Sequence, residues 1–233
     1  MVNQCLINIQ DYLFPARCVL CQSRIAPRQE FCVECERSLL RQQARCTICG
    51  AALPHSHSVS VCGQCQRRPP AYRSALPAVA YCAPVAKLVV DLKYRNKLHL
   101  ARVLGKVLAD AVCAAGAEMP DVIIPVPLHR SRLRSRGYNQ ALEIARPIGR
   151  RLGIPVNPWI VRRTRNTGSQ TELARKDRAK NVQGAFGVRG NVEGLAVAIV
   201  DDVMTTGHTV NCVAECLVQA NAKSVSVWVF ARA

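Results

Sequence analysis

The residues best placed to do chemistry follow one short apolar run near the end of the printed sequence. Val197 to Val200 are apolar, and Asp201 and Asp202 come directly after them. A hydroxyl-rich turn follows, whose Gly207 can adopt backbone angles that other residues avoid. Carboxylates accept hydrogen bonds from sugar hydroxyls or bind Mg²⁺, whereas free N–H groups at a helix start bind phosphate. The segment indicates a ligand with a phosphate, a diol and a metal ion, such as a phosphorylated ribose.

We expect a strand and a helix to position these residues. Four apolar residues in a row are too short for a helix and are typical of a buried central strand. Thr209 is expected to cap a helix that runs to about Ala220. The backbone N–H groups of Thr205 to Thr209 would then surround a phosphate, aided by the helix dipole. Ligands of α/β sheets bind where a strand is followed by a turn and a helix.

A basic segment follows a second predicted strand. Residues 121–127 are apolar and end in prolines, and Leu128 to Gln140 after them is expected to be a loop with alternating arginines. Guanidinium groups bind pyrophosphate in a bidentate manner, although a solvated basic surface is the alternative. The residues assigned to this pyrophosphate loop are Pro127, Arg130, Arg136 and Gly137.

Arg162 to Gly184 is a long polar stretch with seven Lys/Arg and two acidic residues. Long loops in compact domains are often lids, so a cationic lid over the transferred group is one interpretation. Arg163, Arg165 and Lys176 would supply its stabilising charge. A surface loop or a nucleic-acid contact is the alternative.

Eight of the 13 cysteines form four C-x-x-C pairs in the N-terminal part of the chain. Two such pairs supply the four thiolates of a tetrahedral site, so eight thiolates predict two structural Zn²⁺ sites. Sequential pairing is favoured over interleaved pairing, which stays open, and disulfides are the weaker alternative. The sequential sets are Cys18, Cys21, Cys32 and Cys35, then Cys46, Cys49, Cys62 and Cys65.

Composition bounds the class of protein. Lys and Arg outnumber Asp and Glu by 32 to 15, which gives +17 and favours anionic partners such as phosphorylated metabolites or nucleic acid. No signal peptide and no apolar stretch long enough for a transmembrane helix is found, so a cytoplasmic location is expected. We expect a cysteine module at 1–70 and an α/β domain at 71–233, joined near Arg67 to Pro70.

The segment at 197–209 resembles the phosphoribosyl pyrophosphate (PRPP) motif of type I phosphoribosyltransferases. With the cysteine pairs before it, the whole chain resembles the ComF family, also called the GntX type. The stretches that carry this resemblance lie at 13–18, 92–94, 125–130, 136–140, 163–173 and 178–182, followed by the PRPP motif.

The resemblance implies a double zinc ribbon and a type I phosphoribosyltransferase fold, with a mostly parallel sheet of about five strands between helices. It also implies a link to DNA uptake in natural competence, with single-stranded DNA or competence proteins as partners. Mg²⁺ would accompany PRPP. The PRPP-binding residues would be Asp201, Asp202, Val203, Met204, Thr205, Thr206, Gly207, His208 and Thr209.

Two classes of function remain open. One is an enzyme that transfers phosphoribosyl to an acceptor and releases pyrophosphate; its catalytic residues would be Asp201, Asp202, Arg163, Arg165 and Lys176. The other is a non-catalytic protein that binds PRPP or nucleic acid. The sequence identifies no acceptor. We expect the zinc ribbon and the helices of residues 85–115 to roof the site.

Overall fold

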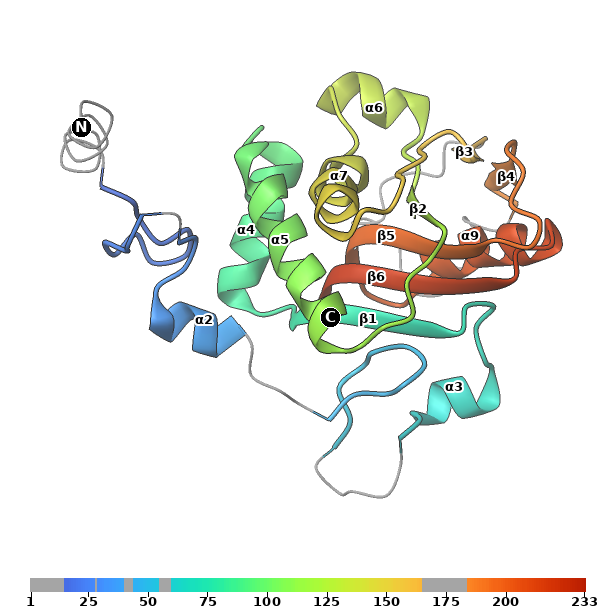
Figure 1. Ribbon diagram of the computed structural model, residues 1–233, viewed down its shortest axis with the longest axis horizontal. Helices are drawn as coiled ribbons and strands as arrows, with labels where there is room; N and C mark the ends of the chain where they lie inside the picture. Colours follow the sequence, from blue (N-terminus) through green and yellow to red (C-terminus); the bar gives the residue numbers. More distant parts are fainter. Residues whose placement is uncertain (1–14, 28, 40–43, 55–59, 165–183) are drawn as a thin grey trace.

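The computed structural model describes residues 15–27, 29–39, 44–54, 60–164 and 184–233 (Figure 1). A four-stranded parallel sheet of order β1-β6-β5-β2 forms its centre. Val156 makes one further parallel bridge to Ile123 beside β2. The strands are β1 (Ser74–Ala80), β2 (Val122–Pro125), β5 (Ala196–Met204) and β6 (Ser224–Arg232). The predicted mostly parallel α/β sheet is therefore confirmed.

Helices cover both faces of this sheet (Figure 1). One face packs against α4 (Ala83–Tyr94), α5 (His99–Ala114) and α7 (Gln140–Leu152). The other packs against α9 (His208–Gln219) and a small antiparallel pair, β3 (Val161–Arg163) and β4 (Phe186–Val188). No helix among the described residues has the length and apolar character needed to cross a membrane.

Strand β5 is buried on both sides, as its continuous apolar run predicts. Ala198 and Val200 belong to the core beneath α4, α5 and α7, whereas Val197 and Ile199 belong to the core beneath α9. All four are at most 1% exposed. This burial fixes the direction of every side chain along the strand, including the two carboxylates that follow.

The cysteine pairs lie in two units outside the sheet. The first includes α2 (Val33–Leu39) and contacts α5 through an ion pair between Glu30 and Arg102 at 2.8 Å. The second includes α3 (Gly63–Arg67) and runs along the edge of β1, where Ile48 accepts a hydrogen bond from the Ala75 amide at 2.7 Å. The second unit therefore extends the sheet edge, and the first rests on the helical layer.

One expected loop is partly a helix. Residues 128–140 contain α6 (Arg130–Arg136), which begins after His129 and ends at Gly137, whose φ is 83°. Successive helical residues turn by about 100°, so alternating arginines do not share one side. Arg130 and Arg134 lie on one side of α6, and Arg132 and Arg136 lie on the opposite side. The expectation of one continuous arginine loop is therefore wrong.

Two further details differ from expectation around the acidic pair. Strand β5 continues through Asp201 and Asp202 to Met204, so the carboxylates lie within the strand. Helix α9 begins at His208 and its N-cap is Gly207, which makes Thr209 a helical residue and not the cap. The predicted end of this helix near Ala220 is confirmed, because Gln219 is its last residue.

Candidate functional site

The two neighbouring carboxylates project to opposite faces of the sheet. Consecutive residues of a strand alternate between its faces, and β5 runs through both aspartates. Asp202 follows the alternation of Ala198 and Val200 toward the α4 layer, and it is 2% exposed. Asp201 follows Val197 and Ile199 toward the opposite layer. The pair therefore offers two carboxylates in two different environments.

Lys93 neutralises the buried member of the pair. Its Nζ lies 2.7 Å from Oδ2 of Asp202, and the two side chains are 22% and 3% exposed. Burial lowers the pKa of Lys93, but the charge and hydrogen bond of Asp202 outweigh it, so the net shift is upward. The other oxygen of Asp202 accepts a hydrogen bond from the Val203 amide at 2.8 Å. The sequence patterns did not assign Lys93 to the site, so this contact was missed.

The surroundings of Asp201 disfavour its charged form. Burial, followed by the charge of Asp202, raises the pKa of Asp201, and Lys93 opposes that shift. One of its oxygens accepts a hydrogen bond from the Asp202 amide at 2.9 Å. Burial, followed by the charge of Arg132, lowers the pKa of Arg163 on β3, and the charge of Asp201 partly opposes this shift. A ligand that donates hydrogen bonds, or a cation, would stabilise the charged form of Asp201.

The segment after β5 has the geometry of an anion site. Gly207 has a φ of 79°, which turns the chain sharply into the 12-residue helix α9. The N-cap residue is a glycine, which has no side chain that could cap the first turn. The N–H groups of this turn and the positive end of the helix dipole attract negative charge. The predicted phosphate loop at 205–209 therefore lies at the carboxyl end of β5, next to the acidic pair.

The end of α4 is fastened to the arginine segment. The guanidinium of Arg136 lies over the ring of Tyr94, 5.2 Å from its centroid. The hydroxyl of Tyr138 donates a hydrogen bond to the Leu92 carbonyl. These contacts hold residues 92–94 between the acidic pair and α6. The tripeptide Leu92-Lys93-Tyr94 thus supplies a lysine that pairs with Asp202 and a tyrosine that contacts Arg136.

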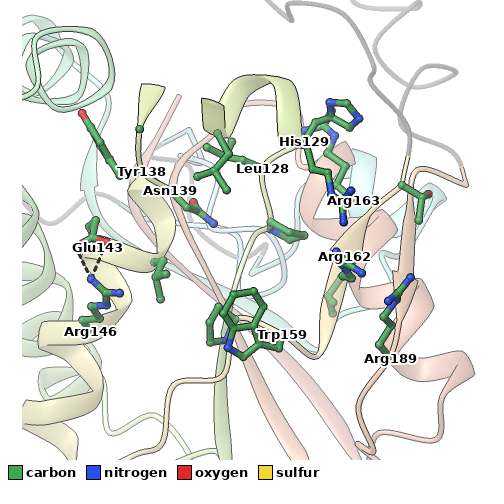
Figure 2. Close-up of a pocket in the computed structure, with 18 residues that line it drawn as sticks. Leu128, His129, Tyr138, Asn139, Glu143, Arg146, Trp159, Arg162, Arg163 and Arg189 are labelled. Atoms are coloured by element: carbon green, nitrogen blue, oxygen red, sulfur yellow. Dashed lines mark hydrogen bonds and ion pairs between the residues drawn. The ribbon is translucent and has the colours of Figure 1, made fainter. Parts of the chain in front are cut away.

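A cavity of about 750 Å³ opens beside the carboxyl end of β2 (Figure 2). Arg162, Arg163 and Arg189 lie on one side of it, and Arg146, paired with Glu143, lies on the other. Trp159 also lines the cavity, and it is 77% exposed. Three residues of the expected pyrophosphate loop also line it, namely Pro127, Arg130 and Gly137.

The structure brings some of the predicted site residues together and separates others. Arg163 shares the cavity with Pro127, Arg130 and Gly137, whereas Arg136 lies against Tyr94. Asp201 and Asp202 lie on β5, shortly before the predicted phosphate loop at 205–209. Arg165 and Lys176 fall outside the described residues. Tyr72, Lys93 and Arg232 were missed, because each comes from an element remote in sequence from residues 201–209. Trp159 was missed although it lies only four residues before Arg163.

The eight cysteines form two closed groups, which confirms sequential pairing. Within each group the four sulfurs all lie within 4.8 Å of one another. Sulfur separations of 3.7 Å for Cys21–Cys32 and 3.6 Å for Cys49–Cys62 are close to the ~3.8 Å edge of a tetrahedron with Zn–S bonds of ~2.3 Å. Both groups therefore fit a structural zinc ion.

Known proteins match both halves of the chain. A double zinc ribbon domain matches residues 9–66, and a phosphoribosyl transferase domain matches residues 138–233. The DNA utilization protein YhgH of Salmonella typhimurium is 33% identical over 223 residues, which cover 94% of this chain and 97% of that protein. Competence protein F of Haemophilus influenzae is 31% identical over 228 residues, which cover 94% and 98%.

Among solved structures, a glutamine PRPP amidotransferase from B. subtilis, complexed with ADP and GMP, is 26% identical. It aligns with a TM-score of 0.38 and covers 55% of this chain and 25% of its own. The near full-length identity to YhgH and competence protein F, together with both domain matches, identifies this chain as a member of the ComF family, in which a double zinc ribbon precedes a phosphoribosyltransferase domain.

Proposed function

We propose that this protein binds PRPP at the carboxyl end of β5. The 5-phosphate would lie on the backbone N–H groups of the loop and first turn from Thr205 to Thr209. The motif that we assign to PRPP runs from Asp201 through Val203, Met204, Thr206 and His208. Its supporting observation is one arrangement: two carboxylates, a left-handed Gly207 and a helix start with glycine as its N-cap follow one another along β5 and α9.

The ribose hydroxyls would bind the acidic pair through Asp201. Asp202 is almost fully buried and already paired with Lys93, so its role is to hold that lysine beside the sugar. Asp201 lacks an ion pair among the described residues and gains most from a donor or a cation. Oxygen donors suit Mg²⁺, which when bound would neutralise the pyrophosphate and make it a better leaving group.

The pyrophosphate would face the arginines beyond β2. Arg130 and Gly137 line the cavity there with Arg163, and Arg136 lies toward the end of α4. We assign Arg163, together with Arg165 and Lys176 outside the described residues, to stabilisation of the departing charge. As the bond from C1 of the ribose to pyrophosphate breaks, an acceptor would attack C1.

Calorimetry tests the binding proposal. Wild-type protein with Mg²⁺ is expected to bind one PRPP per chain, and Asp201→Asn is expected to weaken binding because the ribose loses a charged acceptor. Glu193→Gln is the matched control, since this exposed acid precedes β5 and lies outside the motif. Absence of binding by wild type, or equal binding by Asp201→Asn, would refute the proposal.

Turnover is tested separately by release of pyrophosphate. PRPP, Mg²⁺ and each of a panel of nucleobases are mixed with the protein, and pyrophosphate is measured over time. Release that depends on one acceptor identifies an enzyme. PRPP binding without release across the panel favours the alternative, a non-catalytic PRPP-binding protein of DNA utilization or competence, the roles in the names of its relatives.

One observation favours nucleic acid as a second ligand. Trp159 is exposed beside Arg162 and Arg189 at the mouth of the cavity, and the chain carries a net charge of +17. An exposed indole next to guanidinium groups can stack a base while the arginines bind phosphates. We therefore propose that single-stranded nucleic acid binds at this mouth.

Fluorescence tests this second candidate. The other tryptophan, Trp228, is 1% exposed, so quenching by an added oligonucleotide would report on Trp159. We expect quenching that weakens with salt and is lost in Trp159→Ala. Unchanged oligonucleotide affinity in Trp159→Ala would place the nucleic-acid contact elsewhere.

We also propose that the chain divides into two domains, a double zinc ribbon module at residues 1–70 and a phosphoribosyltransferase-like domain at residues 71–233.

A further inference from the structure

The second cysteine group contacts the phosphate loop through one arginine. Arg232 is the last residue of β6, and its Nε donates a hydrogen bond to the carbonyl oxygen of Cys49 at 3.2 Å. Its Nη1 donates to the carbonyl oxygen of Met204 at 3.1 Å and to that of Thr205. A single guanidinium thus joins a residue of the cysteine group to the first residue of the phosphate loop.

The far end of the loop is held by the segment that leaves the same cysteine group. The backbone N–H of Ala71 donates a hydrogen bond to the side-chain Oδ1 of Asn211 at 2.8 Å. The backbone N–H of Asn211 in turn donates to the carbonyl oxygen of Gly207 at 2.9 Å. Tyr72 is buried, and its hydroxyl lies 3.5 Å from the position that a Cβ on Gly207 would take. Burial raises the pKa of Tyr72, so it stays a neutral phenol behind the loop.

The two cysteine groups differ in this respect. Cys46, Cys49 and Cys65 share one core cluster with Tyr72 and Met204. Cys18 of the first group instead belongs to the cluster of α4 and α5 on the opposite face of the sheet. The chain therefore contains an internal comparison, because two sites of the same chemistry are packed against different parts of the domain.

We propose that the second cysteine group, through Arg232, positions the phosphate loop and thereby sets the affinity for the phosphorylated ligand. Arg232 is a positioning residue in this account, since its partners are loop carbonyls and the Cys49 carbonyl. The inference rests on the proposed PRPP site for its effect on affinity. Its effect on the loop itself needs no ligand.

Hydrogen–deuterium exchange of the full-length protein tests the loop directly, in the absence of PRPP. We expect faster exchange of the amides of residues 203–211 in Arg232→Met and in Cys62→Ala/Cys65→Ala. The matched control, Cys32→Ala/Cys35→Ala, removes two ligands from the other group and should leave these amides unchanged. Arg73→Met is the control for losing an arginine, because Arg73 is exposed and paired with Glu118.

Affinity is measured on the same proteins. PRPP binding is expected to weaken by about tenfold in Arg232→Met, and to recover in part in Arg232→Lys, which keeps one donor group. Each double cysteine variant should retain one zinc ion. Equal exchange in all variants, or equal loosening by both double cysteine variants, would overturn the inference. If wild type itself does not bind PRPP, the proposed function is refuted. The exchange result still decides whether Arg232 and the second cysteine group position the loop.

Discussion

At the scale of single residues, the ion pair between Lys93 and Asp202 stabilises a charged carboxylate that is buried within the sheet. A buried carboxylate costs several kcal/mol unless it is paired and hydrogen-bonded, and Asp202 has both kinds of partner. Asp201 has no ion pair among the described residues, and burial, followed by the charge of Asp202, raises its pKa. The two aspartates of one motif are thus prepared for different tasks.

Removing the lysine should unmask the cost of the buried carboxylate. Lys93→Met is expected to lower the free energy of unfolding by about 3 kcal/mol, because Asp202 then lies buried without its cation. Urea denaturation of Lys93→Met, Asp202→Asn and the double variant forms a closed cycle. We expect the double variant to be more stable than Lys93→Met alone. Purely additive losses would show that the two side chains do not interact.

The raised pKa of Asp201 predicts a stability that depends on pH in one direction. An acid whose folded pKa exceeds its unfolded value contributes stability at low pH that is lost as pH rises through the folded pKa. Asp201→Asn avoids that loss. Without Mg²⁺ or PRPP, the variant should gain stability over wild type as pH rises above about 4, the ordinary value for this side chain. Denaturation from pH 4 to pH 8 checks this, and a constant difference across that range would contradict it.

At the scale of elements, the turn between β5 and α9 requires at position 207 both a left-handed backbone conformation and a residue without a Cβ. Gly207 has a left-handed φ, and a Cβ there would lie 3.0 Å from the Cε of Met204. Gly194 has a φ of 71° with open space around it. A substitution at Gly194 therefore tests backbone strain alone, whereas a substitution at Gly207 tests backbone strain together with crowding against Met204.

Alanine at each glycine gives the corresponding prediction. Gly194→Ala should cost about 1 kcal/mol of stability through backbone strain alone and leave PRPP affinity unchanged. Gly207→Ala should cost at least as much and also weaken PRPP binding, because Met204 and the loop must shift. Thermal denaturation and calorimetry measure the two effects. Wild-type affinity in Gly207→Ala would show that the turn does not shape the ligand site.

The elements with strong patterns were predictable from the sequence. Continuous apolar residues predicted the buried strand β5, and helices were expected within residues 85–115, where most of α4 and all of α5 lie. Helix α6 was missed because none of its residues is buried, so it has no apolar periodicity to detect. Strand β4 is only three residues long. Its antiparallel pairing with β3 is a tertiary contact that local sequence does not reveal.

The candidate site was predictable only where its residues are contiguous. The segment at 201–209 and the cysteine pairs are local patterns with fixed spacing. Lys93 and Arg232 meet that segment only after folding, from α4 and from the end of β6. A basic residue at the end of a helix or strand has too many ordinary explanations for sequence alone to assign it a partner.

At the scale of the whole molecule, the two cysteine units contact different parts of the α/β fold, the first at α5 and the second at the edge of β1. Neither unit depends on a large apolar core of its own, and small modules of this kind are stabilised by metal. We expect two zinc ions per chain by elemental analysis. Chelation should release both and lower the thermal transition of the full-length protein. One zinc ion per chain, or none, would contradict the two closed cysteine groups.

The location of the bound phosphate tests the central claim most directly. A crystal structure of the protein with PRPP and Mg²⁺ is predicted to show the 5-phosphate on the amides of residues 205–209, with the ribose hydroxyls at Asp201. Density for PRPP among Arg162, Arg189 and Trp159, with the loop at 205–209 empty, would contradict the assignment of this loop as the PRPP site.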